Sequence, residues 1–417
     1  MTSRERIQLS LTHKSPDRVP IDLGSNPSAG ISAIAHRNLM KYLGREESPT
    51  LIYDVVQQLA QPDMDLVDLL GVDILDIGRG FNDKSSDWYP VKLATGDKAF
   101  YPSWFKPELN SSGTWEARHR QSGDLIAIMP EGATFFDQTV FPFIDGYPEG
   151  RAAMNEVLDE ALDRVLWSHL VHSPWDHAGD AGFYNELRKK AIHLRETTDK
   201  ALMVVVGSNL FEWGTFLRRM DNFLMDLYTD QGNVAILVEL LMERHMKSLT
   251  AVCESVGDVV DVIRFGDDLG MDSGPFMGLD VYRELFHAHR KRLSDYVHEN
   301  SSMKTFLHTC GSVYQFIPDF IESGIDIINP VQTNCLNMEP ERLKSEFGDD
   351  MVFWGGGMDP REILNKGSVQ QVRTEVARRL DVLAPRGGFV FANIHNIMPD
   401  VPPENIVAMF EAVREFK

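Results

Sequence analysis

The 417-residue sequence predicts an α/β fold, a (β/α)8 barrel of the TIM type with a β-rich and helical insertion between its second and third strands. Eight short apolar runs recur along the chain, and most of them end in Gly, Pro or Asn, as strands do where they enter loops. Helix-like patterns lie between most of these runs. Eight strands that alternate with helices are the number that such a barrel requires.

The eight apolar runs are rich in β-branched and aromatic residues, which favours strands over helices. Their near-continuous apolarity suits parallel strands that are buried on both faces. The runs cover residues 18–24, 71–78, 201–207, 259–266, 303–310, 325–330, 351–355 and 388–395.

Helical segments are expected after the third strand and after each later strand. The last of them opens with Pro402 and Pro403 and carries Glu404 in its first turn, which is typical of a helix N-terminus. The helical patterns cover residues 221–250 (one or two helices), 280–300, 314–323, 340–348, 368–384 and 402–416.

The interval between the second and third strands, residues 79–200, is far longer than a normal loop. Residues 83–147 are rich in Trp, Tyr, Phe, Gly and Pro. Residues 114–120 and 124–129 partly alternate between apolar and polar side chains, which predicts short strands. This part of the interval is therefore expected to form a small β-rich insertion on the rim of the barrel.

The later part of the interval, residues 151–194, is expected to be helical and is dense in Trp and His. These side chains either line a substrate mouth or pack the insertion onto the barrel, and the sequence leaves both interpretations open. We expect one domain over residues 1–417, with the insertion at about 83–195.

Composition limits the location and the partners of the chain. Cys253, Cys310 and Cys335 are too few for a disulfide framework and favour a reducing compartment. The N-terminal residues form no secretory signal, and no apolar run reaches the roughly 18 residues of a membrane span. We therefore expect a cytoplasmic protein without membrane contacts. The formal charge of −21 disfavours nucleic acid as a partner.

Polar side chains recur where the predicted strands end, which is where barrels of this kind place their active sites. This recurrence indicates a site at the barrel mouth. The residues in question are Asp73 and Asp76 (second strand), Glu212 (after the third), Asp267 and Asp268 (fourth), His308 and Cys310 (fifth), Asn329 and Gln332 (sixth), Asp359 (seventh), and His395 and Asn396 (eighth).

The stretch from His308 to Gly311 points to a metal. If the fifth strand continues to Cys310, the side chains of His308 and Cys310 project on the same side. Together with His395 they make three N and S ligands, the pattern of a catalytic Zn²⁺ site with one open position. Glu212 is a candidate fourth ligand, or else a helix N-terminal residue favoured by the helix dipole. A buried cysteine that merely packs is the alternative for Cys310.

The remaining polar residues have other candidate roles. Asp267 and Asp268 are candidates for catalytic proton transfer, since paired carboxylates raise one another's pKa; capping and loop solvation are the alternative for both. The side chains at the ends of the later strands are the candidate substrate-binding residues: Asn329, Gln332, Asp359 and Asn396.

On these motifs the chain resembles the uroporphyrinogen decarboxylase superfamily. The resemblance covers nearly the whole chain except most of the insertion, and it implies a (β/α)8 barrel. Its motifs are Ser15-Pro16-Asp17-Arg18-Val19-Pro20, Gly266-Asp267-Asp268-Leu269-Gly270, His308-Thr309-Cys310-Gly311, Asn329-Pro330-Val331-Gln332, Gly356-Gly357-Met358-Asp359 and Pro402-Pro403-Glu404-Asn405.

Two branches of that superfamily imply different chemistry. Its metal-free decarboxylases bind a porphyrinogen through an arginine-rich N-terminal segment and an aspartate. The corresponding segment of this chain, residues 22–30, contains no arginine, and the next arginine is Arg37. Its cobalamin-dependent methyltransferases bind zinc through a His-x-Cys pair and a late cysteine. His308 and Cys310 match that pair, and His395 occupies the position of the late cysteine.

The resemblance to the second branch implies a zinc-dependent methyltransferase. It would move a methyl group between a small O-, N- or S-methylated substrate and a corrinoid protein that carries methylcobalamin. A second copy of the chain, forming a homodimer, is kept as a further candidate partner. The alternatives are a metal-free decarboxylase that uses Asp73, Asp76 or Asp267, and a non-catalytic corrinoid- or tetrapyrrole-binding protein.

Overall fold

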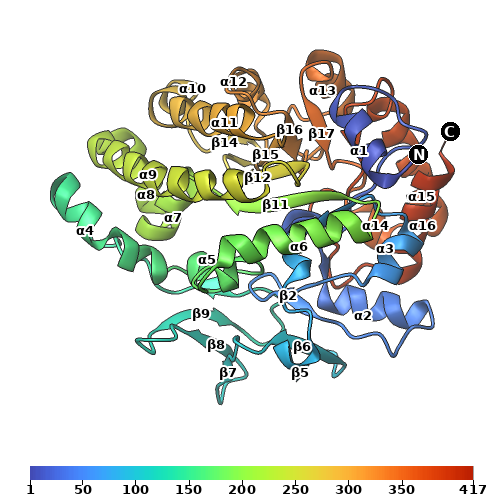
Figure 1. Ribbon diagram of the computed structural model, residues 1–417, viewed down its shortest axis with the longest axis horizontal. Coiled ribbons are helices and arrows are strands. Elements are labelled where there is room, and N and C mark those ends of the chain that lie inside the picture. Colours follow the sequence, from blue (N-terminus) through green and yellow to red (C-terminus); the bar gives the residue numbers. More distant parts are fainter. Residues whose placement is uncertain (417) are drawn as a thin grey trace.

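A computed structural model describes residues 1–416 and contains a curled sheet of seven parallel strands (Figure 1). Each strand pairs in parallel with its neighbours, as the near-continuous apolar runs predict. In spatial order the strands are β18 (Phe389–Val390), β17 (Val352–Trp354), β16 (Ile327–Asn329), β15 (Lys304–His308), β12 (Val262–Gly266), β11 (Ala201–Gly207) and β4 (Ile74–Asp76).

The first predicted strand closes the sheet into a barrel. Ile21 forms a parallel bridge with Phe391, beyond the end of β18. On the other side the amide of Asp73 donates to the carbonyl of Ile21 over 2.8 Å, just before β4 begins. Residues 20–22 thus complete the ring of eight strands, although they form backbone hydrogen bonds with their two neighbours over only a few residues. The predicted barrel of eight strands is confirmed, although its first strand is reduced to this bridge.

Side chains alternate between the two faces of the barrel wall. A compact apolar cluster fills the interior, whereas the outer faces of the strands pack against the helices in a separate, larger cluster. Ile7 and Leu11 of α1 (Ser3–Leu11) belong to the interior cluster. Helix α1 therefore covers the N-terminal end of the barrel, and the polar strand ends lie at the opposite end.

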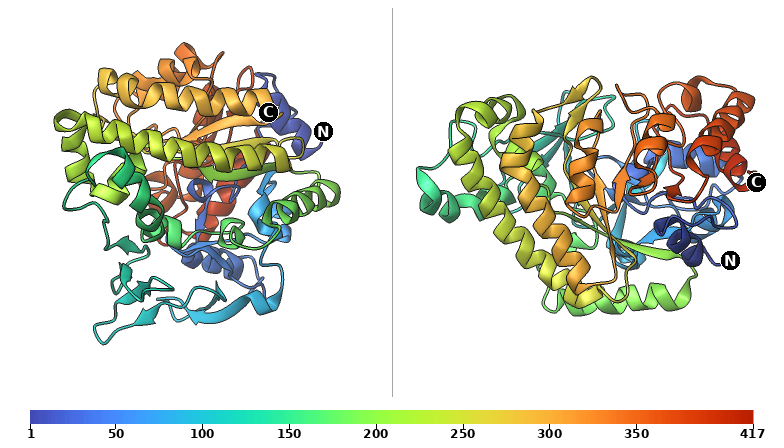
Figure 2. Two further views of the ribbon diagram at one scale, coloured as in Figure 1. Left: turned by 60° about the vertical axis from the view of Figure 1, so that its left-hand side comes forward. Right: turned by 90° about the horizontal axis from the view of Figure 1, so that it is seen from above.

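The helices agree with the patterns read from the sequence. Figure 2 shows α9 and α11 side by side along one flank of the barrel, where they pack on each other. Outside the insertion the helices are α2 (Ala33–Tyr42), α3 (Met64–Leu70), α7 (Phe211–Arg218), α8 (Met220–Thr229), α9 (Gln231–Val256), α10 (Leu279–Tyr282), α11 (Ala288–Asn300), α12 (Ile317–Glu322), α13 (Pro340–Phe347), α14 (Ile363–Lys366), α15 (Val369–Leu383) and α16 (Pro403–Glu415).

The predicted insertion has the expected order of strands followed by helices. The alternating stretches form the antiparallel pair β8–β9, with their own apolar cluster beneath them. Figure 1 shows these strands apart from the barrel helices. The elements are β5 (Trp88–Lys92), β6 (Lys98–Pro102), β7 (Glu108–Leu109), β8 (Trp115–Arg118), β9 (Leu125–Met129), β10 (Asp137–Gln138), α4 (Gly150–Asp163), α5 (Leu166–His169) and α6 (Phe183–Thr197).

Smaller strands complete the architecture without joining the barrel wall. A three-stranded antiparallel sheet follows the first barrel strand, and a two-stranded ribbon follows β12. They are β1 (Ile31–Ser32), β2 (Ile52–Asp54), β3 (Leu59–Ala60), β13 (Gly270–Met271) and β14 (Gly274–Pro275).

A buried ionic network ties the first strand to β4. The Asp73 side chain is fully buried and accepts hydrogen bonds from Arg6 and Arg18 at 2.7 Å each. It also accepts from the amide of Ile21 over 2.8 Å. Asp73, a candidate for proton transfer in the decarboxylase alternative, thus holds the barrel closed at the approach to β4.

We expect the change Asp73→Ala to destabilise the barrel, because it leaves two guanidinium groups without their carboxylate. Breaking a largely buried ion pair costs about 3–5 kcal/mol in the free energy of unfolding. Urea unfolding followed by circular dichroism measures this loss. Asp17→Ala is the matched control, since Asp17 also pairs with Arg6 but is 45% exposed, and it should cost less than about 1 kcal/mol. Equal losses in the two variants would contradict the assignment.

Candidate metal centre

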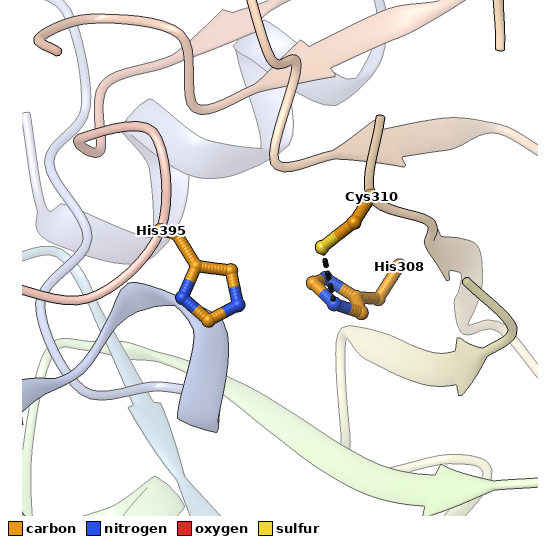
Figure 3. Close-up of side chains that lie close together, drawn as sticks. All are labelled: His308, Cys310 and His395. Carbon is orange, nitrogen blue, oxygen red and sulfur yellow. Dashed lines mark hydrogen bonds between the residues drawn. The ribbon is translucent and has the colours of Figure 1, made fainter. Parts of the chain in front are cut away.

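Strand β15 delivers His308 to the barrel mouth and ends there. Cys310 lies just past the strand rather than within it, because its amide donates to Oδ1 of Asp268 over 2.9 Å. Gly311 then turns the chain with φ of +87°, where an added Cβ would meet the backbone of Gly270 at 2.2 Å. Despite this earlier strand end, Cys310 Sγ lies 3.6 Å from His308 Nε2 (Figure 3).

His395 reaches the same place from the loop after β18. Its ring centre is 5.8 Å from that of His308, and Figure 3 shows the imidazole facing His308 and Cys310. One ligand atom from each of the three residues lies within 4.8 Å of the others. His395 has φ of +86°, a left-handed conformation that is strained for a histidine and that occurs mainly at functional sites.

The hydrogen bonds of His308 leave the correct nitrogen free for a metal. Its Nδ1 lies 2.8 Å from Oδ1 of Asn329, an atom that can only accept, so Nδ1 carries the proton. The Nε2 lone pair then faces Cys310. Burial lowers the pKa of His308 to about 3, with Arg264 acting in the same direction, so the ring is neutral. A neutral imidazole oriented by a second hydrogen bond is the usual form of a metal-binding histidine.

The spacing and the thiol chemistry also fit zinc. Bonds of about 2.0 Å to nitrogen and 2.3 Å to sulfur in a tetrahedral site place these two atoms roughly 3.5 Å apart. The pKa of the Cys310 thiol is raised by burial and by Asp268. A protonated thiol is a poor nucleophile, and a divalent cation would replace its proton. The three residues therefore fit a zinc ligand set better than a free cysteine nucleophile.

A second group of similar residues lies in the insertion and does not fit a metal. Asp163 lies 2.9 Å from His119 Nε2 and 3.7 Å from His169 Nδ1. The other nitrogen of each ring accepts a backbone amide, from Ser122 in one case and Arg120 in the other. The nitrogens that face Asp163 must therefore carry the protons. Neither ring therefore has a free lone pair for a metal. The three residues instead connect the end of β8 with α4 and α5.

Two further carboxyl groups lie beside the candidate metal ligands. Asp268 Oδ1 is 3.4 Å from His308 Nε2, and its side chain is 36% exposed. Glu212 accepts a hydrogen bond from the Asn209 amide. Burial raises the pKa of Glu212 well above its usual value, and Asp268 and Asp267 add to this effect. A partly exposed aspartate thus lies near a carboxyl group whose pKa is raised, an arrangement suited to moving a proton.

Asp267 points away from this group although it adjoins Asp268. It is fully buried and pairs with Arg290 over 2.6 Å. It also accepts the amides of Leu210 and Glu212 at 3.0 and 2.9 Å, at the start of α7. These contacts favour a structural role, so the catalytic role expected for Asp267 stays a prediction and Asp268 is the better placed of the two.

The contacts of Asn329 favour an orienting role over direct substrate binding. Its Oδ1 accepts from Ser28 Oγ over 2.7 Å as well as from His308. Its Nδ2 donates to the carbonyl of Trp354 over 2.9 Å. All of its polar atoms are engaged inside the protein, and they hold the first metal ligand in place.

The other three residues expected to bind substrate also make internal contacts at the ends of their strands. Gln332 accepts from the amide of Gly311. Asn396 Oδ1 accepts from the amide of Gly30 over 3.1 Å, and its Nδ2 donates to Oε1 of Gln57 over 3.2 Å. Asp359 accepts the amide of Arg361 over 2.8 Å. Their roles in binding stay predictions.

Arg264 is a mouth residue that the strand-end rule does not find, because it lies inside β12 rather than at its end. A charged residue within an apolar barrel strand is the sequence signal that identifies it.

A separate cavity of about 390 Å³ lies under the insertion, lined by residues such as Gln58, Tyr101 and Pro399. None of the residues lining that cavity belongs to the candidate metal centre.

Comparison with known proteins establishes the family. The family model for uroporphyrinogen decarboxylase (URO-D) matches residues 199–416, just over half of the chain. That stretch carries β11 to β18 and all three candidate ligands. The chain belongs to the uroporphyrinogen decarboxylase family.

Individual relatives match this chain either over short segments or over its full length at low sequence identity. The uroporphyrinogen decarboxylase of Pseudoalteromonas translucida is 33% identical over 102 residues, 24% of this chain and 27% of that protein. That of Ectopseudomonas mendocina is 28% identical over 145 residues, 34% of this chain and 39% of that protein. The chain thus spans between about a quarter and two fifths of these curated relatives. A solved methyltransferase from Methanosarcina mazei has the same fold, with a TM-score of 0.58, 16% identity and coverage of 100% and 99% of the two chains.

We expect Asn329→Ala to weaken zinc binding by about 10–100-fold, because Nδ1 of His308 loses the acceptor that fixes its tautomer. Competition with a chromophoric chelator measures the affinity. Asn334→Ala is the matched control: Asn334 is exposed, and its amide contacts Asp359 rather than a candidate ligand. An affinity for zinc that is the same in both variants would contradict the orienting role.

Proposed function

We propose that the chain is a zinc-dependent methyltransferase that moves a methyl group between a small methylated substrate and a corrinoid protein. The observation that carries this proposal is the convergence of His308, Cys310 and His395, with their ligand atoms within 4.8 Å of one another. The three lie at or beyond the C-terminal ends of the fifth and eighth barrel strands, where barrel enzymes hold their active sites. The family membership of the chain agrees with this reading.

When bound by these residues, zinc would supply a Lewis acid for a substrate heteroatom. His308 and Cys310 would fix it from one side of the mouth and His395 from the other. Glu212 is the candidate for a fourth protein ligand, and without it that position is open to substrate. Asn329 and Ser28 would keep the His308 ring in the binding tautomer.

Proton movement falls to the two carboxyl groups beside the ligands. In methyl removal the carbon leaves its O, N or S atom without the bonding electron pair, and the corrinoid accepts it. The heteroatom then needs a proton. Glu212, whose pKa burial raises, is the candidate to give it when it does not bind the metal. Asp268, which is partly exposed, can return that proton from solvent.

A metal-free decarboxylase is the second candidate, because the curated relatives carry that name. Two observations weigh against it. Residues 22–30 contain no arginine, and Arg6 and Arg18 are occupied by Asp73 away from the mouth. Asp76 is the acid of this alternative that remains at the mouth end of its strand, where burial raises its pKa to about 6.

The metal part of the proposal predicts about one zinc per chain in protein purified without a histidine tag. Cys310→Ala and His395→Ala should both lose it, because each removes one of three ligands. Plasma mass spectrometry measures the content. Cys335→Ala, which removes a thiol outside the ligand group, should retain the metal. A zinc-free, folded wild-type protein would refute this part of the proposal.

The transfer itself predicts methylation of cobalamin. Zinc-loaded protein, mixed with cob(I)alamin and a panel of methyl ethers, methylamines and methyl thioethers, should convert the absorbance of cob(I)alamin to that of methylcobalamin for at least one class. Asp268→Asn should slow that conversion by about 10²–10⁴-fold, the usual contribution of a proton-transfer group. Equal rates for Asp268→Asn and wild type would exclude Asp268 from the reaction.

A further inference from the structure

Arg264 points into the barrel. On β12, Ile263 and Phe265 belong to the outer cluster that packs against helices, whereas Val262 belongs to the interior cluster. Alternation therefore turns Arg264 inward. Its neighbours in register are Val205 on β11 and Phe306 on β15, both of which are also interior residues.

The guanidinium lies close to the candidate metal centre. Arg264 precedes Gly266 by two residues, and Gly266 pairs in register with His308. Its charge is one of the causes that lower the pKa of both His308 and His395. Arg264 thus faces the barrel interior two residues before the strand end that lies beside His308.

Within the described residues Arg264 has no hydrogen-bond or ion-pair partner, although the charges of Glu212 and Asp268 act on its pKa against the lowering caused by burial. Among residues 1–416 no carboxylate forms an ion pair with it, and its Nε is buried without a hydrogen bond. Arg6, Arg18 and Arg290, in contrast, all contact buried aspartates at 2.6–2.7 Å. An unpaired charge in a half-buried position is costly, so a guanidinium held there is a candidate for pairing with a ligand.

A second unpartnered group belongs to the small three-stranded sheet beside the barrel. Tyr53, on β2, is 8% exposed, and its buried hydroxyl has no hydrogen-bond partner. Burial raises the pKa of Tyr53 well above its usual value; the charges of Asp54, Asp76 and Asp22 act in the same direction, and the charge of Arg264 acts in the opposite direction. Asp22 already accepts from Trp354 and Ser25 at 2.8 and 2.7 Å, and Asp76 accepts the amide of Gly78 over 2.9 Å. Neither aspartate pairs with Arg264.

We propose that Arg264 and Tyr53 bind a carboxylate of the methyl-donor substrate and so select small methylated acids over their neutral analogues. A guanidinium fork matches a carboxylate in two parallel hydrogen bonds, and a tyrosine hydroxyl can add a third. The bound carboxylate would lie deeper in the barrel than the metal centre, with the methyl group toward the mouth. The chain has a formal charge of −21, and the positive charge of Arg264 would attract an anion to this part of the barrel.

This inference rests on the proposed methyltransferase function, and calorimetry separates the two. Zinc-loaded protein is titrated with 4-methoxybenzoate and methoxyacetate, and with their uncharged amides 4-methoxybenzamide and 2-methoxyacetamide. The wild type should bind at least one acid at least tenfold more tightly than its amide. Arg264→Gln should abolish that preference, and Arg264→Lys should keep part of it because the charge remains without the fork.

Two further variants keep the test decisive. Tyr53→Phe should reduce the preference for the acid several-fold, and it removes only one oxygen atom, so it serves if Arg264→Gln does not fold. Arg361→Gln is the matched control, since the Arg361 side chain is 62% exposed and makes only a 3.9 Å contact with Asp272; it should leave the preference unchanged.

The outcomes distinguish a failure of this inference from a failure of the proposed function. A wild-type protein that binds each acid no better than its amide, or an undiminished preference in Arg264→Gln, overturns the carboxylate site. If Arg264 serves only to balance the charges of Glu212 and Asp268, the Arg264→Gln variant will melt at a lower temperature with the acid preference intact. The zinc content of each sample reports separately on the metal centre.

Discussion

The register of three neighbouring strands is the constraint on which the candidate centre depends. Gly266, His308 and Asn329 lie opposite one another on β12, β15 and β16. This register places Asn329 Oδ1 at 2.8 Å from His308 Nδ1, which fixes the tautomer of the ring. A slip of one residue would turn His308 toward the helices. The parallel ladder thus sets the chemistry of a side chain as well as the position of the backbone.

Charges are divided between the two ends of the barrel according to function. Just before β4, Asp73 forms ion pairs with Arg6 and Arg18, so its charge is compensated where the first strand meets β4. At the mouth, Glu212, Asp268 and Arg264 lie near one another without forming an ion pair between the carboxylates and the arginine. Unmatched groups cost stability, and they are tolerated mainly where a ligand completes them. The contrast supports a binding role for the mouth.

Much of the fold was predictable, because buried parallel strands and amphipathic helices leave strong periodic signals. The apolar runs nevertheless overestimate strand length: residues 71–78 contain only the three residues of β4, since Asp76 turns back to accept the amide of Gly78. His308, Cys310 and His395 could be identified by their places at strand ends. The different surroundings of Asp267 and Asp268 could not, because they depend on Arg290 of α11, 23 residues later in the chain. The absence of a partner for Arg264 likewise emerges only in three dimensions.

Helix α1 gives the barrel a property that its strands alone do not determine. Because Ile7 and Leu11 pack into the interior cluster, the barrel is closed at its N-terminal end. A small molecule bound above that cluster can arrive and depart only through the mouth, which a docked protein would cover. For the proposed reaction this imposes a sequence in time: the small substrate enters first, the large partner closes over it, and the partner must detach before the next exchange. Turnover would then be governed by the lifetime of a protein complex as much as by the chemical step.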